Sequence, residues 1–168
     1  NVYVNLRKNL NTKVFVDVIG DFKDTVISRT IEPDFSDVLY ISSGGFIQQI
    51  KKDDYKLIRS SDASSINLSK LYVTKDNLWG LSTQNSTVYK MDLITNTLVA
   101  QTSTFGNITM SRPIDITAIG DFIFVVDAGN GRIIKSNSDL VFISSVGEIG
   151  IQSITSDKNF IYVFNVND

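Results

Sequence analysis

The chain has 168 residues, a hydrophobic content of 42%, and 16 basic against 18 acidic side chains, which gives a net charge of −2. A chain of this length and apolar content can bury a sizeable core, which a disordered tail cannot do. It holds no Cys and no His, which excludes disulfides, thiolate or imidazole metal sites, and every mechanism that needs a Cys nucleophile or an imidazole base.

The charge pattern and the hydropathy also exclude some partners. Nucleic-acid binding needs clustered Lys and Arg, and the chain has no such cluster, so we expect no nucleic-acid partner. No apolar run approaches the roughly 18–20 residues of a membrane span, so we expect no membrane insertion. The chain begins at Asn1 without a signal peptide, so we expect a processed chain or a piece of a longer one.

Apolar residues along the chain mostly alternate with polar ones or form short runs of β-branched and aromatic residues, and both patterns predict strands. Turn-forming segments such as SSGG, TKDN, AGNG and SDKN separate these runs. The only prolines, Pro33 and Pro113, fall between strands, where a missing N–H does no harm. No window sustains the helical period of 3.6 residues, so we predict an all-β fold.

The predicted strands group into three units of four. The first unit has its strands at residues 25–31, 37–42, 46–51 and 55–60. The second unit has them at residues 70–75, 77–83, 87–93 and 97–103. The third unit has them at residues 113–119, 122–128, 132–136 and 140–146. With their connections, the three units cover about residues 25–65, 70–106 and 112–148.

The units repeat, and their period indicates the architecture. An aromatic residue recurs in the second strand of each unit at steps of 38 to 45 residues, at Tyr40, Trp79, Phe124 and Tyr162. A unit of about 40 residues holds four short strands and their turns, which is the size of a propeller blade. We therefore predict a single β-propeller domain over residues 1–168, with about four four-stranded blades.

The two ends of the chain together predict one further blade. Residues 2–20 (VYVNLRKNLNTKVFVDVIG) resemble residues 88–106 (VYKMDLITNTLVAQTSTFG), which hold the third and fourth strands of the second unit. Residues 150–168 hold a first and a second strand. We expect residues 150–168 and 1–20 to form a composite closing blade, which would leave no open sheet edge. A fragment of a larger propeller would show the same pattern, so both interpretations stay open.

The third unit resembles an NHL repeat. The matching features are Pro113, the strand DFIFVVD with Asp127, the turn GNGRI with Asn130 and Arg132, and the closing Gly147. This resemblance, to the NHL and YncE-like group of propellers, implies a disc that binds partners on one face. Relatives in this group that are lyases rely on His, which this chain lacks.

Four residues are candidate binding residues: Arg112, Asn130, Arg132 and Trp79. Asp127 and Arg132 flank one turn, where they form either a charged pair on a binding rim or a structural pair across the hairpin. Trp79 either packs against a neighbouring blade or offers its ring for stacking by a sugar or a peptide. No D-x-D-x-D loop occurs, so we predict no metal site. We also predict no cofactor and no catalytic residue.

Three functions remain open at this point. We favour a non-catalytic binding or scaffold module with a protein partner or self-association, and a glycan as a further possible ligand. The alternatives are a carboxylate-dependent hydrolase or lyase, and a structural protein that assembles through its end strands. Abundant Ser, Thr and Asn without Cys suggest an extracellular or virion-surface location, while a cytoplasmic one stays open.

Overall fold

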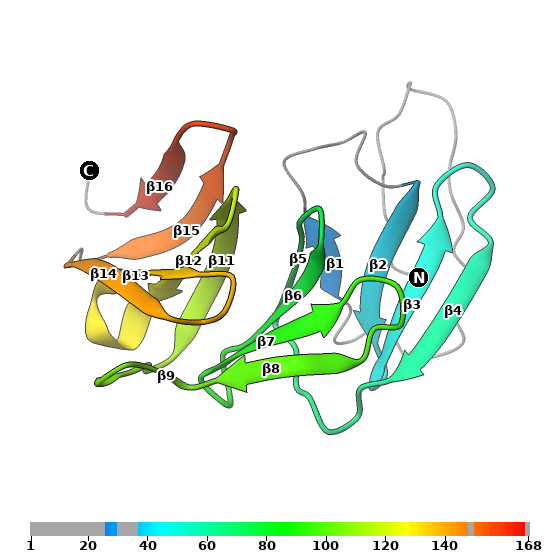
Figure 1. Ribbon diagram of the computed structural model, residues 1–168, viewed down its shortest axis with the longest axis horizontal. Coiled ribbons are helices and arrows are strands. Elements are labelled where there is room, and N and C mark those ends of the chain that lie inside the picture. The colour runs from blue at the N-terminus through cyan, green and yellow to red at the C-terminus, as the bar shows by residue number, and fades with distance from the viewer. Residues whose placement is uncertain (1–25, 30–36, 148–149, 167–168) are drawn as a thin grey trace.

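The structure is a computed structural model that describes residues 26–29, 37–147 and 150–166. The regular elements in these ranges are strands, apart from one 3-10 turn at Ala128–Asn130, which confirms the predicted all-β fold. No helix in the described ranges is long and apolar enough to cross a membrane. Figure 1 shows the sheets following one another in chain order.

The described strands form three blades of four antiparallel strands each, one two-stranded half-blade and one short hairpin. The first blade holds β1 (Val26–Arg29), β2 (Val38–Ser43), β3 (Phe46–Lys51) and β4 (Leu57–Asp62). The second blade holds β5 (Lys70–Val73), β6 (Asn77–Ser82), β7 (Thr87–Asp92) and β8 (Leu98–Thr102). The third blade holds β11 (Pro113–Ile119), β12 (Phe122–Asp127), β13 (Arg132–Asn137) and β14 (Phe142–Gly147). The half-blade holds β15 (Ile151–Ser156) and β16 (Ile161–Asn165), and the short hairpin of β9 (Thr104–Phe105) and β10 (Ile108–Thr109) precedes the third blade.

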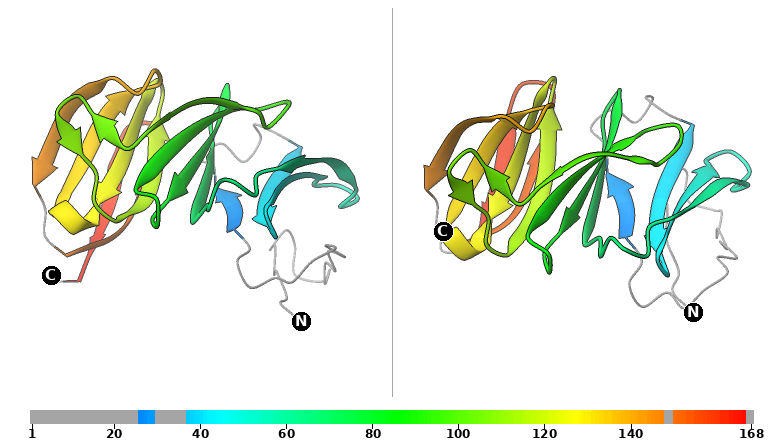
Figure 2. Two further views of the ribbon diagram at one scale, coloured as in Figure 1. Left: turned by 90° about the horizontal axis from the view of Figure 1, so that it is seen from below. Right: turned by 60° about the horizontal axis from the view of Figure 1, so that its bottom comes forward.

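The first strands of the blades lie next to one another. β1 pairs in parallel with β5 through Ser28↔Leu71, which joins the first two blades into one eight-stranded sheet. β11 contacts β5 on one side and β15 on the other. The two further views show the blades side by side, with their sheets turned relative to one another (Figure 2).

Most strands lie within one or two residues of the prediction, and two fourth strands begin later because their turns are longer. Tyr55 adopts a left-handed backbone (φ 56°), so β4 begins at Leu57. In the third blade, the side chain of Asn137 accepts hydrogen bonds from the backbone N–H groups of Asp139 and Val141. These bonds hold the turn up to the start of β14.

The core lies between the blades. The second strands β2 and β6 are buried at five consecutive positions because both faces of the sheet are covered. One buried cluster joins the first two blades and includes Tyr40, Ile47 and Tyr89. A second cluster joins the second and third blades and includes Trp79 and Ile134. This layered packing explains why the strands are continuous apolar runs and not strictly alternating ones.

The predicted strands within residues 1–20 lie outside the described residues. The composite blade is therefore described only through β15 and β16. A third buried cluster packs this half-blade against the third blade and includes Ile133, Ile151 and Ile154.

Candidate functional site

The candidate binding residues are distributed over two faces of the molecule. In each blade, the turns between strands one and two and between strands three and four lie at one end of the sheet, and the turn between strands two and three lies at the other. We call the end that carries Asp121 the Asp121 face, and the opposite end the Arg132 face. Asn130 and Arg132 lie on the Arg132 face: Asn130 is in the turn between β12 and β13, and Arg132 is the first residue of β13.

On the Arg132 face, the carboxylate of Asp127 organises the turn. Its side chain is 0% exposed, and Oδ2 accepts hydrogen bonds from Nε of Arg132 (2.8 Å) and Nδ2 of Asn130 (2.9 Å). Oδ1 accepts a hydrogen bond from the backbone N–H of Ser111 (2.6 Å). Arg132 also donates from Nη2 to the carbonyl of Thr109 (2.9 Å). These hydrogen bonds connect the turn of the third blade to the segment that precedes β11. Asp127 and Arg132 therefore form a structural pair across the hairpin, which was one of the two alternatives from the sequence.

The backbone at this turn is tightly packed. The N–H of Gly129 donates to the carbonyl of Ser111 (2.8 Å). A Cβ atom at position 129 would lie 2.4 Å from Oγ and 2.5 Å from the carbonyl oxygen of Ser111. The neighbouring Arg112 has a left-handed backbone (φ 47°), and its N–H donates to Oγ of Ser86 (3.1 Å). The turn therefore requires glycine at position 129 because no side chain fits.

Trp79 lies between the second and third blades and is 1% exposed, so no face of its ring is open for stacking. The Nζ atom of Lys90, on the paired strand β7, lies 5.7 Å from the centre of the ring. Lys90 reaches across to the third blade, where it donates to the carbonyl of Ser138 (2.7 Å) and approaches Asp139 (3.6 Å). These contacts join two blades at the Asp121 face.

A polar cavity of about 310 Å³ lies at this junction. Turns from both blades line it, together with the strands that carry Trp79 and Lys90. The polar side chains in its wall belong to Thr74, Lys75, Asp76, Asn77, Lys90, Asp121 and Ser138. The indole Nε1 of Trp79 is the one buried side-chain polar atom in the described ranges that has no hydrogen-bond partner. We call this the Trp79 cavity. The repeat pattern placed Trp79 at an interface between blades but gave no sign of the cavity.

The carboxylate of Asp115, in the first strand of the third blade, is held by hydrogen bonds within the fold. It is buried in β11, and Oδ2 accepts hydrogen bonds from Oγ of Ser153 (2.7 Å) and the N–H of Ile154 (2.9 Å) in the half-blade. Its Oδ1 accepts from the N–H of Ile116 (3.0 Å). Asp115 is the single acid in the first strands that the structure describes, so these strands bring no carboxylate pair together. Across the described ranges, no group of three potential metal ligands occurs.

The acids with shifted pKa values lie at the surface: Asp62 and Asp92 end strands β4 and β7, and Asp157 lies in the turn before β16. The backbone N–H of Ser64 lowers the pKa of Asp62, and that of Thr95 lowers the pKa of Asp92. The phenol of Tyr162 donates to Asp157 and lowers the pKa of that carboxyl. Each of these carboxylates is thereby stabilised in its charged form as a hydrogen-bond acceptor. A general acid would need the opposite shift.

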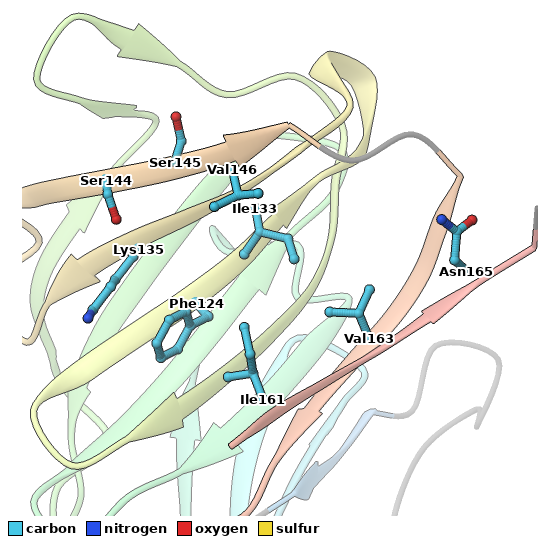
Figure 3. A pocket seen from close by; sticks show the side chains of 9 residues that line it. All are labelled: Phe124, Ile133, Lys135, Ser144, Ser145, Val146, Ile161, Val163 and Asn165. Carbon is cyan, nitrogen blue, oxygen red and sulfur yellow. The ribbon is translucent and has the colours of Figure 1, made fainter. Parts of the chain in front are cut away.

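The half-blade forms one wall of an open groove of about 470 Å³ (Figure 3). Ile161 and Val163 of β16 line one side, and Phe124 and Ile133 of the third blade line the other. The remaining lining residues are Lys135, Ser144, Ser145, Val146 and Asn165. The groove is apolar at its centre, and no candidate residue from the sequence lies in it.

Known structures resemble the fold at low sequence identity. The Neurospora crassa Pan2 WD40 domain matches with a TM-score of 0.61 at 12% identity, over 85% of this chain and 49% of that one. The beta-propeller domain of Myceliophteria thermophila Cps50 (Swd1) matches with a TM-score of 0.64 at 12% identity, over 78% and 47%. Myxococcus xanthus glutaminyl cyclase matches with a TM-score of 0.60 at 9% identity, over 83% and 66%.

The fold is a β-propeller. The chain spans about half the length of the first and second of these structures. No protein-family model matches the sequence, and no curated protein sequence does either. Since the matched structures include an enzyme by its printed name, the fold alone leaves the function open.

Proposed function

We propose that this propeller is a binding or scaffold module without chemistry of its own, and that it recognises a protein partner at the Trp79 cavity. The observation that carries the proposal is the polar cavity at the junction of two blades, whose wall includes Trp79, a side chain with an unpartnered indole N–H. Buried polar groups in folded proteins are normally hydrogen-bonded, so a donor without an acceptor marks a place where one can be supplied.

The composition of the cavity favours a polypeptide over a sugar. Its rim carries both signs of charge, with Lys75 beside Asp76 and Asp121, which suits a partner that presents donors and acceptors together. Sugar recognition by Trp uses an open ring face, and the ring of Trp79 is covered. Turns from different blades meet on one propeller face, and such turns are where a rigid scaffold commonly carries its recognition residues.

The state of the acids supports binding in place of catalysis. The two carboxylates that are buried in the described part of the chain, Asp115 and Asp127, are held by hydrogen bonds within the fold. A carboxylate-dependent hydrolase would need a carboxyl with a raised pKa next to a second one. The shifted acids in the described ranges all have lowered pKa values.

We further propose that the third blade is of the NHL type. Asp127 and Arg132 stand directly opposite each other on β12 and β13, which supports the motif-based resemblance. An extracellular or virion-surface location rests on composition alone and stays a prediction.

Affinity purification with a matched pair of charge reversals tests the proposed function. The bait is the intact chain, presented to an extract of the cells from which the sequence comes. We expect one protein to be recovered by the parent chain and lost with Asp121→Lys, which reverses a charge on the cavity rim. Asp53→Lys makes the same change in an exposed turn of the first blade and should recover that protein in full. Equal recovery by both variants would contradict the proposal.

A further inference from the structure

The pattern Asn-x-Ser/Thr occurs at Asn67 (NLS), Asn85 (NST) and Asn107 (NIT). In a chain that enters a secretory pathway, this pattern accepts N-linked sugars, and the asparagine must then lie at the surface of the folded protein. The pattern is short, and a chain rich in Ser, Thr and Asn contains it by chance. Its meaning therefore depends on where the fold places the three asparagines.

All three asparagines lie on the Arg132 face. Asn85 is in the turn between β6 and β7, which joins the second and third strands of its blade. The fourth strands also end at this face, so the segments that lead from β4 to β5 and from β8 to β11 lie there too. Asn67 belongs to the first of these segments, and Asn107 lies in the turn of the β9–β10 hairpin, which belongs to the second.

Hydrogen bonds show that these segments are neighbours. Nδ2 of Asn67 donates to Oε1 of Gln84, in the turn between β6 and β7. The same turn accepts a hydrogen bond from the segment that precedes β11. The carbonyl of Thr109, two residues after Asn107, accepts one from Arg132. The three asparagines therefore lie along one continuous stretch of the Arg132 face.

The fold accommodates a sugar at each position. The three asparagines are exposed. Asn85 holds its turn through its backbone, since its N–H donates to Oγ of Ser82 (3.0 Å) and its carbonyl accepts from Oγ1 of Thr87 (2.8 Å). The side-chain amide is not needed for either bond. A glycosylated amide keeps one N–H, so the hydrogen bond that Asn67 donates can remain.

The opposite face lacks the acceptor pattern. Among the described residues, the asparagines in or next to the turns of the Asp121 face are Asn77, Asn96, Asn137 and Asn159. The residues two positions further along are Trp79, Leu98, Asp139 and Ile161, and none of these is Ser or Thr. The Trp79 cavity lies at the Asp121 face, so sugars on the three acceptors would leave it uncovered.

We propose that Asn67, Asn85 and Asn107 are N-glycosylation sites and that their sugars cover the Arg132 face. The sugar donor is an oligosaccharide linked to a lipid pyrophosphate. The amide Nδ2 forms a bond to the anomeric carbon of the first sugar, and the bond from that carbon to the pyrophosphate oxygen breaks. The lipid pyrophosphate leaves with the bonding electrons, and one amide proton passes to the transferring enzyme.

The proposed modification has consequences for location and for binding. It requires a compartment that holds this donor, in agreement with the extracellular or virion-surface location predicted from composition. Sugars on the Arg132 face would prevent another protein from docking flat against it and would restrict recognition to the remaining surface. The sites themselves do not depend on the proposed function, because they lie on the opposite face from the Trp79 cavity.

Peptide mass spectrometry of the chain purified from its source tests the proposal. Digestion with a peptide N-glycosidase in heavy-oxygen water converts each glycosylated Asn to Asp and inserts one heavy oxygen atom. We expect heavy Asp at positions 67, 85 and 107, and unchanged Asn137 and Asn159 as internal controls. Unmodified Asn at any of the three positions would overturn the proposal for that position. Sugars on the Asp121 face would overturn the assignment to one face.

A matched pair of substitutions at Thr109 tests the acceptor pattern itself. Thr109 is exposed, and its contacts to Asn130 and Arg132 are made by its backbone carbonyl, which both variants keep. Expressed in the source cells, Thr109→Ala should lose the sugar at Asn107, and Thr109→Ser should keep it. The same occupancy in both variants would contradict the proposal. Mass reports the sugars whether or not a partner is recovered, so failure of this inference and failure of the binding function are distinguishable.

Discussion

Replacing Asp127 with Ala tests whether the carboxylate on the Arg132 face holds the third blade together. In the parent chain, this buried side chain accepts hydrogen bonds from Arg132, Asn130 and the N–H of Ser111. The substitution removes the acceptor of all three and leaves the guanidinium of Arg132 with the carbonyl of Thr109 as its remaining partner.

The expected loss follows from these contacts. Removing one partner of a buried ion pair costs about 3–5 kcal/mol, because the other charge stays buried without compensation. The side chain of Arg132 is 24% exposed, so water recovers part of its solvation and the lower end of that range applies. We therefore expect Asp127→Ala to lower the free energy of unfolding by about 3 kcal/mol.

Urea unfolding, followed by Trp fluorescence and far-UV circular dichroism, measures this loss. Asp53→Ala is the control. The carboxylate of Asp53 lies 3.8 Å from Nζ of Lys51, and the side chain of Asp53 is 68% exposed and that of Lys51 47% exposed. Such a surface pair contributes about 0–1 kcal/mol. A loss for Asp127→Ala as small as that of the control would refute the reasoning that the buried carboxylate organises this turn.

Substitutions at three further positions test other parts of the structure. Trp79→Phe keeps an aromatic ring between the blades and removes the unpartnered N–H, so unfolding experiments should show a smaller loss than the about 3–5 kcal/mol for Trp79→Ala. Gly129→Ala places a methyl group against Ser111 and should cost about 1–3 kcal/mol in the same assay. The hydrogen bond to Asp157 raises the pKa of Tyr162. The stability that this bond contributes is therefore fully present below the ordinary pKa of tyrosine. This stability is lost as the pH rises through the raised pKa of Tyr162. Ultraviolet titration of Asp157→Asn should show that pKa falling toward its ordinary value; an unchanged titration would show that the bond is absent.

The sequence predicted the strands and the repeat because both depend on local patterns. Apolar runs and turn residues fix where β6 or β12 begins, and the spacing of Tyr40 and Trp79 fixes the period. The later starts of β4 and β14 were missed because they depend on the left-handed residue Tyr55 and on hydrogen bonds that the side chain of Asn137 accepts from the backbone. The residue types in a turn do not by themselves indicate at which residue the next strand begins.

The sites were harder to predict because they join residues that are distant in sequence. The pairing of Asp127 with Arg132 lies within one hairpin, so the sequence could suggest it. Asp115 finds its partners in the half-blade, 38 and 39 residues further along the chain, and no local pattern indicates them. The Trp79 cavity needs turns from two blades, and its exact shape depends on how those blades pack.

The measurement that tests the central claim most directly is photo-crosslinking from the rim of the Trp79 cavity. A photoreactive amino acid replaces Asp121 in one sample and Asp53 in another, and each chain is irradiated in an extract of its source cells. The account predicts an adduct with one defined protein from position 121 and none with that protein from position 53. No adduct from position 121, or the same adducts from both positions, would contradict recognition of a partner at this cavity.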